Sequence, residues 1–425
     1  MPPPRSPKGE PVAITGAGIV SPLGNAVGEF DAALFAGRSA VRAQALDLPG
    51  IDLPAVAVAP AAFDAAAEIA PSRVPLDRAT AMALRAARDA ARAARLDAGT
   101  FDAQRLGIFW GSGMAGATTF EATCRSVYAD RRRMRPTSVL TAMPNAPLAE
   151  LALLFGARGA ALAYACACAS SAVAIGEAMR AIRAGWIDVA IAGGSESMLT
   201  PGVLASWQAM RVLAPLSAAV ARGEDDGVAA LCRPFAADRI GFALGEAAAA
   251  FVLEAPAHAR GRGARAEAML AGYATNCDGM HITNPDAAGQ ARAMRAALAD
   301  AGLQPSDIGY VNAHGTATTN GDAAEADSLG RVFGAHGVAV SSSKAIHGHL
   351  LGAGGAVELL ACLGALRTGR LPPTANVASA DPVFAIDLVT DTARMAPSLR
   401  AAMSNSFAFG GTNAVLIAMR PPADD

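Results

Sequence analysis

The stretch ACACASSA, residues 165–172, joins an apolar strand pattern to the first turn of an alanine-rich helical pattern. A strand-to-helix junction offers free backbone N–H groups and the positive end of a helix dipole, and both lower the pKa of a thiol. Cys168 lies at this junction and is therefore our candidate nucleophile. Buried cysteines are usually small packing residues. We assign that role to Cys166, Cys232, Cys277 and Cys362.

Three further motifs follow: VNAHGTATTNGD at 311–322, SSSKAIHGHLLGAGGAVE at 341–358 and NSFAFGGTN at 405–413. They place His314 and His349 in turns rich in Gly, Ser and Thr. A thiol, two imidazoles and a glycine-rich loop are the parts that thioester chemistry needs. The simpler alternative is that these turns only require small residues. Three other histidines lack such a setting and are taken as structural: His258, His281 and His336.

Strand and helix patterns alternate along the chain, which predicts an α/β fold with helices on both sides of its sheets. The charged, glycine-rich segment HARGRGARAE at 258–267 interrupts the alternation. We therefore divide the chain into a first half, 11–260, and a second half, 261–425. The expected strands are 12–15, 106–110, 162–165, 188–192, 247–253, 268–274, 309–312, 400–405 and 414–419. The expected helices are 77–96, a segment running from ACACASSA to about 184, 288–301, 321–333 and 354–367.

The composition excludes several classes of protein. With 425 residues, 52% of them hydrophobic, the chain can bury a large core. A formal net charge of -2 argues against a nucleic-acid partner. Six cysteines in so long a chain do not form a disulfide framework, so we expect a reducing, cytoplasmic location.

Two segments resemble targeting or membrane signals only superficially. Residues 1–10 are proline-rich and polar, which indicates a flexible lead-in rather than a signal peptide. The uncharged stretch 159–176 has nearly the length of a membrane span. It consists mainly of Ala, Ser, Cys and Gly, so we expect a buried strand leading into a buried helix, and no membrane partner.

Motifs for cofactors are incomplete. Gly16-Ala17-Gly18 lacks the third glycine of a dinucleotide turn, so we expect a tight strand-to-helix turn there. GSGMAG at 111–116 lacks the Lys-Ser/Thr of a phosphate loop. Cys166 and Cys168 are spaced too closely for a zinc site shared with HGH at 347–349, and alternation on a strand points them to opposite faces.

Taken together, ACACASSA and the three later motifs resemble the β-ketoacyl-acyl-carrier-protein synthases, in particular their type II, elongating branch. The likeness extends from VAITGAGIVSPLG at 12–24 to GTNAVLIAM at 411–419. It implies the thiolase fold, with two similar α-β-α-β-α halves that form a five-layered core. It also implies an assembly of two chains, either a homodimer or a heterodimer with a ketosynthase-like chain-length subunit.

The resemblance also implies roles for individual residues. Cys168 matches the nucleophile, and His314 and His349 complete its triad. Phe409 matches a gating phenylalanine whose N–H, with that of Cys168, forms an oxyanion hole. Lys344 and Glu358 match a buried ionic pair, and Glu325 matches an acidic residue near the first histidine. The expected substrate contacts are two threonines for the phosphopantetheine arm, Thr316 and Thr318, together with Phe407 and Asn413. The expected contacts for the carrier protein are Arg132, Arg133 and Arg211, with Arg78 nearby.

Four positions depart from the family pattern. Cys166 replaces a common threonine or serine, and Ala408 replaces a glycine beside the gate. Trp207 replaces a phenylalanine in a second gate loop, and Met114 occupies a position that lines the acyl pocket in relatives. NSFAFGG and ATNCDGMHITNP (274–285) resemble ketosynthases of polyene or aryl polyene pathways.

The resemblance implies transfer of an acyl group from acyl carrier protein to Cys168, followed by decarboxylating condensation with malonyl-carrier protein in fatty acid or polyketide biosynthesis. It requires no metal and no redox cofactor. Two alternatives belong to other classes: a non-catalytic chain-length subunit, and a thiolase or acyltransferase that uses coenzyme A thioesters. The intact Cys-His-His set argues against both.

Overall fold

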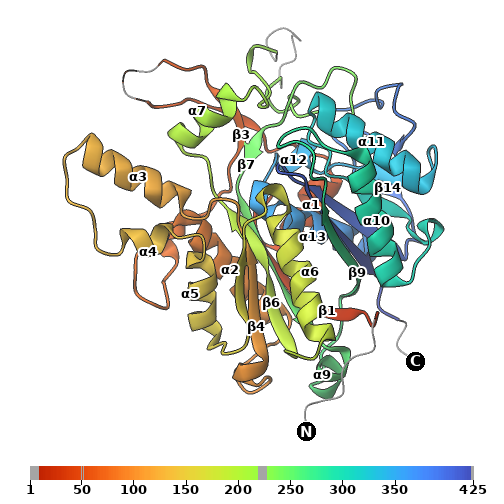
Figure 1. Ribbon diagram of the computed structural model, residues 1–425, viewed down its shortest axis with the longest axis horizontal. Helices are drawn as coiled ribbons and strands as arrows, with labels where there is room; N and C mark the ends of the chain where they lie inside the picture. The colour runs from red at the N-terminus through yellow and green to blue at the C-terminus, as the bar shows by residue number, and fades with distance from the viewer. Residues whose placement is uncertain (1–8, 49, 51, 219–226, 423–425) are drawn as a thin grey trace.

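The computed structural model describes residues 9–48, 50, 52–218 and 227–422 (Figure 1). Most of the predicted lead-in, residues 1–8, lies outside the described residues. The first half contains β1 (Val12–Val20), α1 (Val27–Phe35), β2 (Arg42–Gln44), β3 (Val56–Ala59), α2 (Arg78–Ala93), β4 (Leu106–Gly111), α3 (Ala117–Tyr128), α4 (Ser138–Ala142), α5 (Ala146–Phe155), β5 (Ala161–Tyr164), α6 (Ser170–Arg183), β6 (Val189–Glu196), α7 (Pro201–Ala209), β7 (Leu244–Gly245) and β8 (Ala247–Glu254).

The second half begins after α9 (Pro256–Gly261). It contains β9 (Ala268–Cys277), α10 (Ala287–Ala301), β10 (Tyr310–Asn312), α11 (Thr319–Phe333), β11 (Ala339–Ser341), α12 (Lys344–His347), α13 (Gly354–Thr368), β12 (Arg370–Leu371), β13 (Asp387–Leu388), β14 (Arg394–Met395), β15 (Ala401–Phe407) and β16 (Thr412–Met419).

The main sheet is an internal duplication, with its strands in the order β13-β11-β10-β15-β16-β9-β1-β8-β6-β4-β5. In the first half, β4 pairs in parallel with β5 and β6, and β6, β8 and β1 follow in antiparallel. In the second half, β10 pairs in parallel with β11 and β15, and β15, β16 and β9 follow in antiparallel. The strand order and pairing therefore repeat, and the half-sheets join where β1 pairs with β9.

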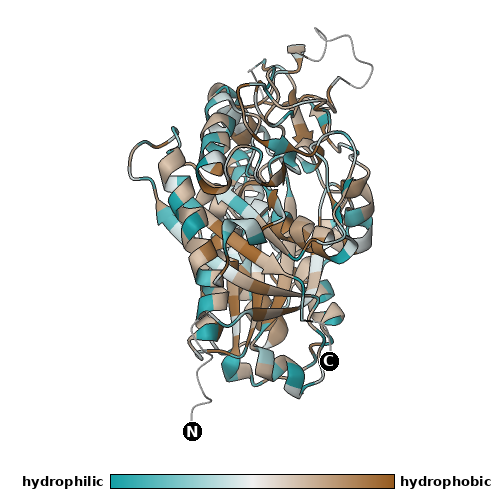
Figure 2. Cartoon of the chain, turned by 90° about the vertical axis from the view of Figure 1, so that its right-hand side faces the viewer, coloured by the Kyte–Doolittle hydropathy of each residue, from teal (hydrophilic) through white to brown (hydrophobic). Residues whose placement is uncertain are grey.

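Helices fill the space between the half-sheets and cover both outer faces (Figure 1). In the middle, α6 packs on β4 and β6, α13 packs on β10 and β15, and the two helices contact each other. On the outside, α2 and α5 cover the first half-sheet, and α10 with its neighbour α11 covers the second. Figure 2 shows the apolar strands inside and polar residues on the outer helices. The result is the five-layered α/β architecture that the resemblance implies.

Two glycine pairs lie inside strands, contrary to the sequence prediction. Gly16 and Gly18 do not form a turn; they belong to β1, where an added Cβ would meet Ala90 O at 2.4 Å or Ala86 O at 2.1 Å. Their role is to let α2 lie directly on the strand. Gly193 and Gly194 likewise do not end a strand, because β6 continues to Glu196.

The uncharged stretch 159–176 forms β5 and the start of α6. The expectation of a buried strand is wrong here: Ala161, Leu162 and Ala163 are exposed, because β5 is the edge of the sheet. A different segment, Leu351–Thr368, is long and apolar enough to cross a membrane by composition, yet it is 89% buried inside the fold. It contains α13, the central helix, which explains its apolar composition.

Candidate active site

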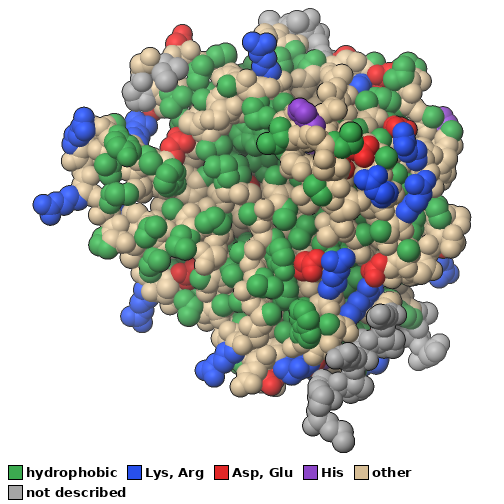
Figure 3. Space-filling view, in the orientation of Figure 1, with side chains coloured by type: hydrophobic (Ala, Val, Ile, Leu, Met, Phe, Trp, Pro, Cys, Tyr) green, Lys and Arg blue, Asp and Glu red, His purple; other side chains and the backbone are tan. Residues whose placement is uncertain are grey.

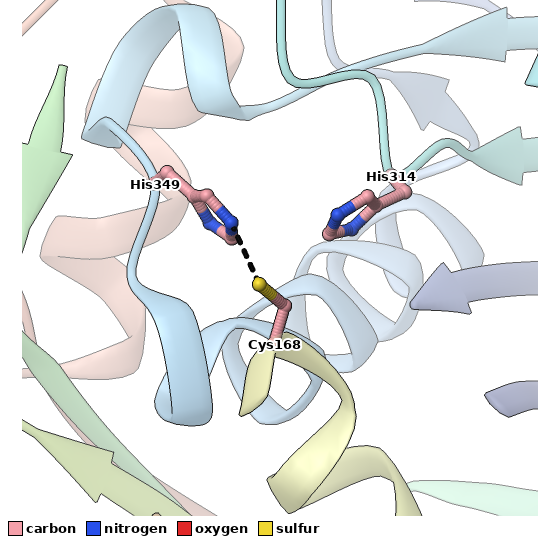
Figure 4. A group of neighbouring side chains, drawn as sticks. All are labelled: Cys168, His314 and His349. Atoms are coloured by element: carbon pink, nitrogen blue, oxygen red, sulfur yellow. Dashed lines mark hydrogen bonds between the residues drawn. The ribbon is translucent and has the colours of Figure 1, made fainter. Parts of the chain in front are cut away.

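Cys168, His314 and His349 meet between the two halves of the fold (Figure 4). Cys168 lies in a short 3-10 helix, Ala167–Ala169, that leads into α6. His314 follows β10, and His349 follows α12. His349 Nε2 lies 3.1 Å from Cys168 Sγ, and the two imidazole rings meet edge to face with centroids 5.3 Å apart. All three side chains are buried.

The two neighbouring cysteines are separated by a turn rather than by strand alternation. β5 ends at Tyr164, next to the predicted end at 165, so strand alternation does not relate the two thiols, as we assumed in arguing against zinc; Ala167, with a φ of 48°, turns the chain between them. Ser170 holds this turn: its Oγ accepts from the Cys166 N–H (2.9 Å) and donates to the Ala167 carbonyl (2.7 Å). Cys168 therefore faces the histidines (Figure 4), and Cys166 does not line their cavity.

The pKa of the Cys168 thiol is raised, although the sequence predicts the opposite. Burial raises this pKa to about 12, against the lowering effect of Lys344 and of the backbone N–H groups of Phe409 and Cys168. The prediction considered the helix end and left out desolvation, which is the larger effect here. The resting thiol is thus neutral and needs a base. The same two N–H groups can stabilise an oxyanion formed beside the sulfur.

The proton position on His349 is set by a backbone contact. The Leu351 N–H donates to His349 Nδ1 over 3.3 Å, so a neutral ring carries its hydrogen on Nε2, which faces Cys168. Burial and the nearby Lys344 charge hold the pKa of His349 well below its usual value. His349 is therefore arranged as a hydrogen-bond donor rather than as a base.

The proton position on His314 is not set by a contact of this kind within the described residues. Its Nδ1 is buried and has no hydrogen-bond partner among the described residues. Burial, Lys344 and His349 lower its pKa well below the usual value, so the ring is neutral and has a lone pair to accept a proton. Glu325 fixes the backbone here by accepting from the N–H groups of His314 (2.9 Å) and Gly315 (2.7 Å). His314 is thus the better candidate for the base.

Lys344 and Glu358 form an ion pair inside the protein, with side chains only 1% exposed. Burial raises the pKa of Glu358, and Lys344 partly offsets this effect. The Lys344 charge disfavours protonation of both catalytic-site histidines. Its geometry suits an electrostatic organiser rather than a proton acceptor.

Phe409 lines the same cavity as Cys168 and the two histidines. Its ring stacks on Trp207 of α7, with centroids 6.2 Å apart and planes at 22°. Ala408 N donates to Thr412 O over 2.8 Å, and Gly410 N donates to Ile282 O over 2.8 Å. The loop that carries Phe409 is therefore held by an aromatic contact on one side and by backbone contacts on the other.

A cavity of about 370 Å³ contains Cys168, His314 and His349. Seven of the predicted substrate and carrier residues line it: Thr316, Thr318, Phe407, Ala408, Phe409, Asn413 and Arg211. The sequence reasoning missed three of its polar wall residues: Asp278, His281 and Gln290. The signal for Asp278 and His281 was the polar run ATNCDGMHITNP at 274–285, whereas Gln290 on α10 had none.

The remaining predicted residues lie elsewhere. Met114 is 50% exposed and does not line the cavity. Arg78 is held by contacts within the fold: it pairs with Glu246 at 2.6 Å and donates to the carbonyls of Ala61 and Phe63. Its guanidinium therefore does not suit a contact with the carrier protein. Arg132 and Arg133 are exposed on the segment between α3 and α4.

Sγ of Cys168 and one nitrogen of each histidine lie within 4.8 Å of one another, close enough for a metal ion. A metal would need the lone pair of His349 Nε2, where the Leu351 contact places a hydrogen. The fixed charge of Lys344 also opposes a cation. The residues therefore fit thioester chemistry better than metal binding.

The duplicated five-layered fold with this buried thiol is that of the thiolase-fold condensing enzymes. Two family descriptions match the chain: "Beta-ketoacyl synthase, N-terminal domain" over residues 9–259 and "Beta-ketoacyl synthase, C-terminal domain" over 267–378. The chain belongs to the β-ketoacyl synthase family and is an acyltransferase of that family.

Relatives and solved structures agree with this assignment. Nodulation protein E of Rhizobium leguminosarum bv. trifolii is 42% identical over 81% of this chain and 82% of its own. The 3-oxoacyl-[acyl-carrier-protein] synthase 2 of Staphylococcus aureus is 37% identical over 80% and 84%. A type II polyketide ketosynthase in complex with its acyl-carrier protein has a TM-score of 0.86 at 28% identity, covering 99% and 100%. The ishigamide ketosynthase/chain length factor has a TM-score of 0.85 at 30% identity, covering 99% and 100%.

Proposed function

We propose that this protein is a decarboxylating β-ketoacyl-acyl-carrier-protein synthase in which Cys168 is the nucleophile. The observation that carries the proposal is the contact between a buried thiol and His349, with His314 alongside and two N–H groups aimed at the sulfur. Cys168 attacks the thioester of acyl carrier protein, and its proton passes through His314 to the departing carrier thiol. The products are acyl-Cys168 and free carrier protein.

Malonyl-carrier protein then occupies the same cavity. His349 donates from Nε2 to the malonyl thioester oxygen, which stabilises the enolate formed as carbon dioxide leaves. The enolate carbon attacks acyl-Cys168, the carbon–sulfur bond breaks, and the thiolate regains a proton. The neutral state of His349 supports its donor role, because an imidazolium beside Lys344 is disfavoured. For the same reason His314 does not store the thiol proton but passes it directly to the departing carrier thiolate.

Intact-protein mass spectrometry tests the proposal directly. The wild type, mixed with acyl- and malonyl-carrier protein, should gain the acyl mass and release β-ketoacyl-carrier protein. Cys168→Ala should remain folded and lose both signals, whereas Cys166→Ala should keep them. An acyl group mapped to Cys166, or product formed only from coenzyme A thioesters, would falsify the assignment.

We also propose that a second ketosynthase-fold chain covers the β5 face, by which we mean the exposed β5 edge together with α3 and α4. Edge strands and broad apolar surfaces are normally covered in stable proteins. In α3 only Ala117 is buried, and Figure 3 shows apolar side chains over this projecting part. Exposed apolar residues of this region include Phe120, Tyr128, Val139, Leu140 and Leu162.

A second copy of this chain is the partner we favour, because the β5 edge can pair with itself about a twofold axis. Light scattering should then give a dimer for the chain purified alone, and Leu162→Arg should give a monomer. A monomer that forms a complex only with a co-expressed ketosynthase-like subunit indicates a heterodimer instead.

A cytoplasmic location is supported by the six cysteines, which are all unpaired.

A further inference from the structure

One polar residue in the wall of the active-site cavity has no role in the chemistry described above. Gln290 lies on α10, at the right of Figure 1, and lines the same cavity as Cys168 and both histidines. Its side chain is only 1% exposed, and its carboxamide oxygen has no hydrogen-bond partner among the described residues. A buried, unpaired amide oxygen is unfavourable and calls for an explanation.

The surrounding helix face makes the amide more unusual. The other buried residues of α10 are Gly289, Ala291, Ala293, Met294, Ala297 and Leu298, all small or apolar. A helix that packs on a sheet needs no polar group at such a position. Packing therefore does not account for Gln290, which lines the cavity with a buried, unpaired oxygen.

The neighbouring polar groups are already paired with one another. Asn413 Nδ2 donates to Asp278 Oδ1 (2.6 Å) and to Asn276 Oδ1 (2.9 Å). The Asp286 N–H donates to the other oxygen of Asp278 over 3.0 Å. Among the described residues, these contacts leave the Gln290 carboxamide oxygen without a partner in this part of the cavity.

The local charges limit what that ligand can be. The carboxylate of Asp278 lines the cavity at the start of α10, since it would contact a Cβ added at Gly289, and the carboxylate of Asp286 caps the same helix. A carboxylate or phosphate ligand would be repelled by them. An uncharged carboxamide can both donate and accept, which suits a carbonyl or hydroxyl oxygen.

We propose that Gln290 binds a neutral oxygen of the substrate, and that this oxygen is a hydroxyl or carbonyl group on the acyl chain. The proposal rests on the proposed function, because it concerns the substrate of the same cavity. On this proposal the enzyme acts on acyl chains that carry a hydroxyl or carbonyl group rather than on unsubstituted saturated chains. The same chemistry could come from the amides of the pantetheine arm, so the experiment separates the two sources.

The test compares the wild type with Gln290→Met, which keeps the length of the side chain and removes its hydrogen bonds. Three kinds of octanoyl donor are used: octanoyl-carrier protein, its β- and δ-hydroxyoctanoyl counterparts, and the octanoyl thioester of ethanethiol, which lacks the pantetheine amides. Loading of Cys168 is followed by intact mass and kcat/KM. Gln104→Met, an exposed substitution far along the chain, controls for the loss of an amide as such.

The wild type should prefer at least one hydroxylated donor over octanoyl-carrier protein. Gln290→Met should lose between about threefold and tenfold on that donor alone, the effect of one hydrogen bond. A loss on every carrier-bound donor, with the ethanethiol thioester unaffected, assigns the oxygen to the pantetheine arm. Equal losses on all donors, or no loss on any, overturn the proposal.

Failure of the proposed function gives a different result. In that case the wild type does not load Cys168 from any donor. Circular dichroism and the dimer mass of Gln290→Met must match those of the wild type. Where they do not, Gln290→Leu serves instead: it removes both hydrogen-bonding groups, suits the apolar face of α10, and should impair the hydroxylated donor selectively.

Discussion

Trp207 stacks on Phe409, and the same indole meets Phe242 edge-on with centroids 5.8 Å apart. Phe242 in turn meets the ring of His349 edge-on at 5.1 Å. A chain of aromatic contacts therefore joins α7, at the surface, to the histidine beside Cys168. Displacement of Phe409 to admit an acyl chain requires loss of the Trp207 contact first.

Replacement of Trp207 by Leu should accelerate loading of Cys168. An aromatic pair is worth about 0.5–1.5 kcal/mol beyond its buried area, so removal of the stack should raise the loading rate by up to about tenfold. Rapid-quench mass spectrometry measures the rate. Trp186→Leu is the matched control, because Trp186 is 73% exposed and makes none of these ring contacts. A slower rate for Trp207→Leu would mean that the indole orders the acyl chain instead.

Ala408→Gly should widen the range of acyl chains that the enzyme accepts. The Ala408 side chain is buried, and its Cβ restricts the backbone of the loop that carries Phe409. Glycine at position 408 lets the backbone of this loop move together with the Phe409 ring. Loading of a series of saturated acyl-carrier proteins should extend to longer chains than in the wild type. The idea fails if the wild type already loads every length equally and the variant does the same.

The two histidines should respond differently to glutamine. Gln places an N–H donor near the position of His349 Nε2, so His349→Gln should keep part of the decarboxylation of malonyl-carrier protein, whereas His349→Leu should lose it. His314→Gln should abolish transfer of the thiol proton, because a carboxamide is not a base at neutral pH. Carbon dioxide release and Cys168 acylation are measured separately. Equal residual activity in His349→Gln and His349→Leu would contradict the assigned donor role.

The pH dependence of Cys168 alkylation should show no plateau near neutrality. The thiol pKa is about 12, so the thiolate fraction rises about tenfold with each pH unit across the range in which the protein is stable. Iodoacetamide labelling, resolved by peptide mapping, should therefore accelerate steadily with pH, while N-acetylcysteine levels off once the pH exceeds the ordinary thiol pKa of about 8.5 by about one unit. A plateau for Cys168 below about pH 8 would show that the helix end outweighs burial after all.

Apolar periodicity was sufficient to predict the α/β class and the division of the chain near residue 260. The duplicated fold and the grouping of Cys168, His314 and His349 into one site followed instead from the resemblance of the ordered motifs to a known family. The errors come from contacts between distant segments. Gly16 and Gly18 looked like a turn because nothing near them shows that α2 packs on the strand. The raised pKa of Cys168 depends on burial, which its neighbours along the chain do not determine.

Contacts between distant segments also explain why the polar wall of the cavity was not predicted from the sequence. Gln290 is one glutamine in a regular helical pattern, and only the packing of α10 places its amide beside the catalytic residues. The Leu351 N–H that sets the tautomer of His349 is invisible in a sequence for the same reason. Motifs therefore identified the reacting groups, whereas the structure was needed for their protonation and their surroundings.

Charge reversal at Arg132 and Arg133 should weaken the use of carrier-bound substrates. Both side chains are exposed and form no ion pair within the described residues, while Arg211 lines the mouth of the cavity. Acyl carrier protein is acidic, so Arg132→Glu with Arg133→Glu should raise KM for acyl-carrier protein several-fold and reduce its dependence on salt. An ethanethiol thioester should be used as before. The paired change Arg260→Glu with Arg400→Glu, also on exposed residues, controls for the change in net charge. If both substrates lose equally, the arginines act on folding or on the catalytic centre, and the carrier protein binds elsewhere.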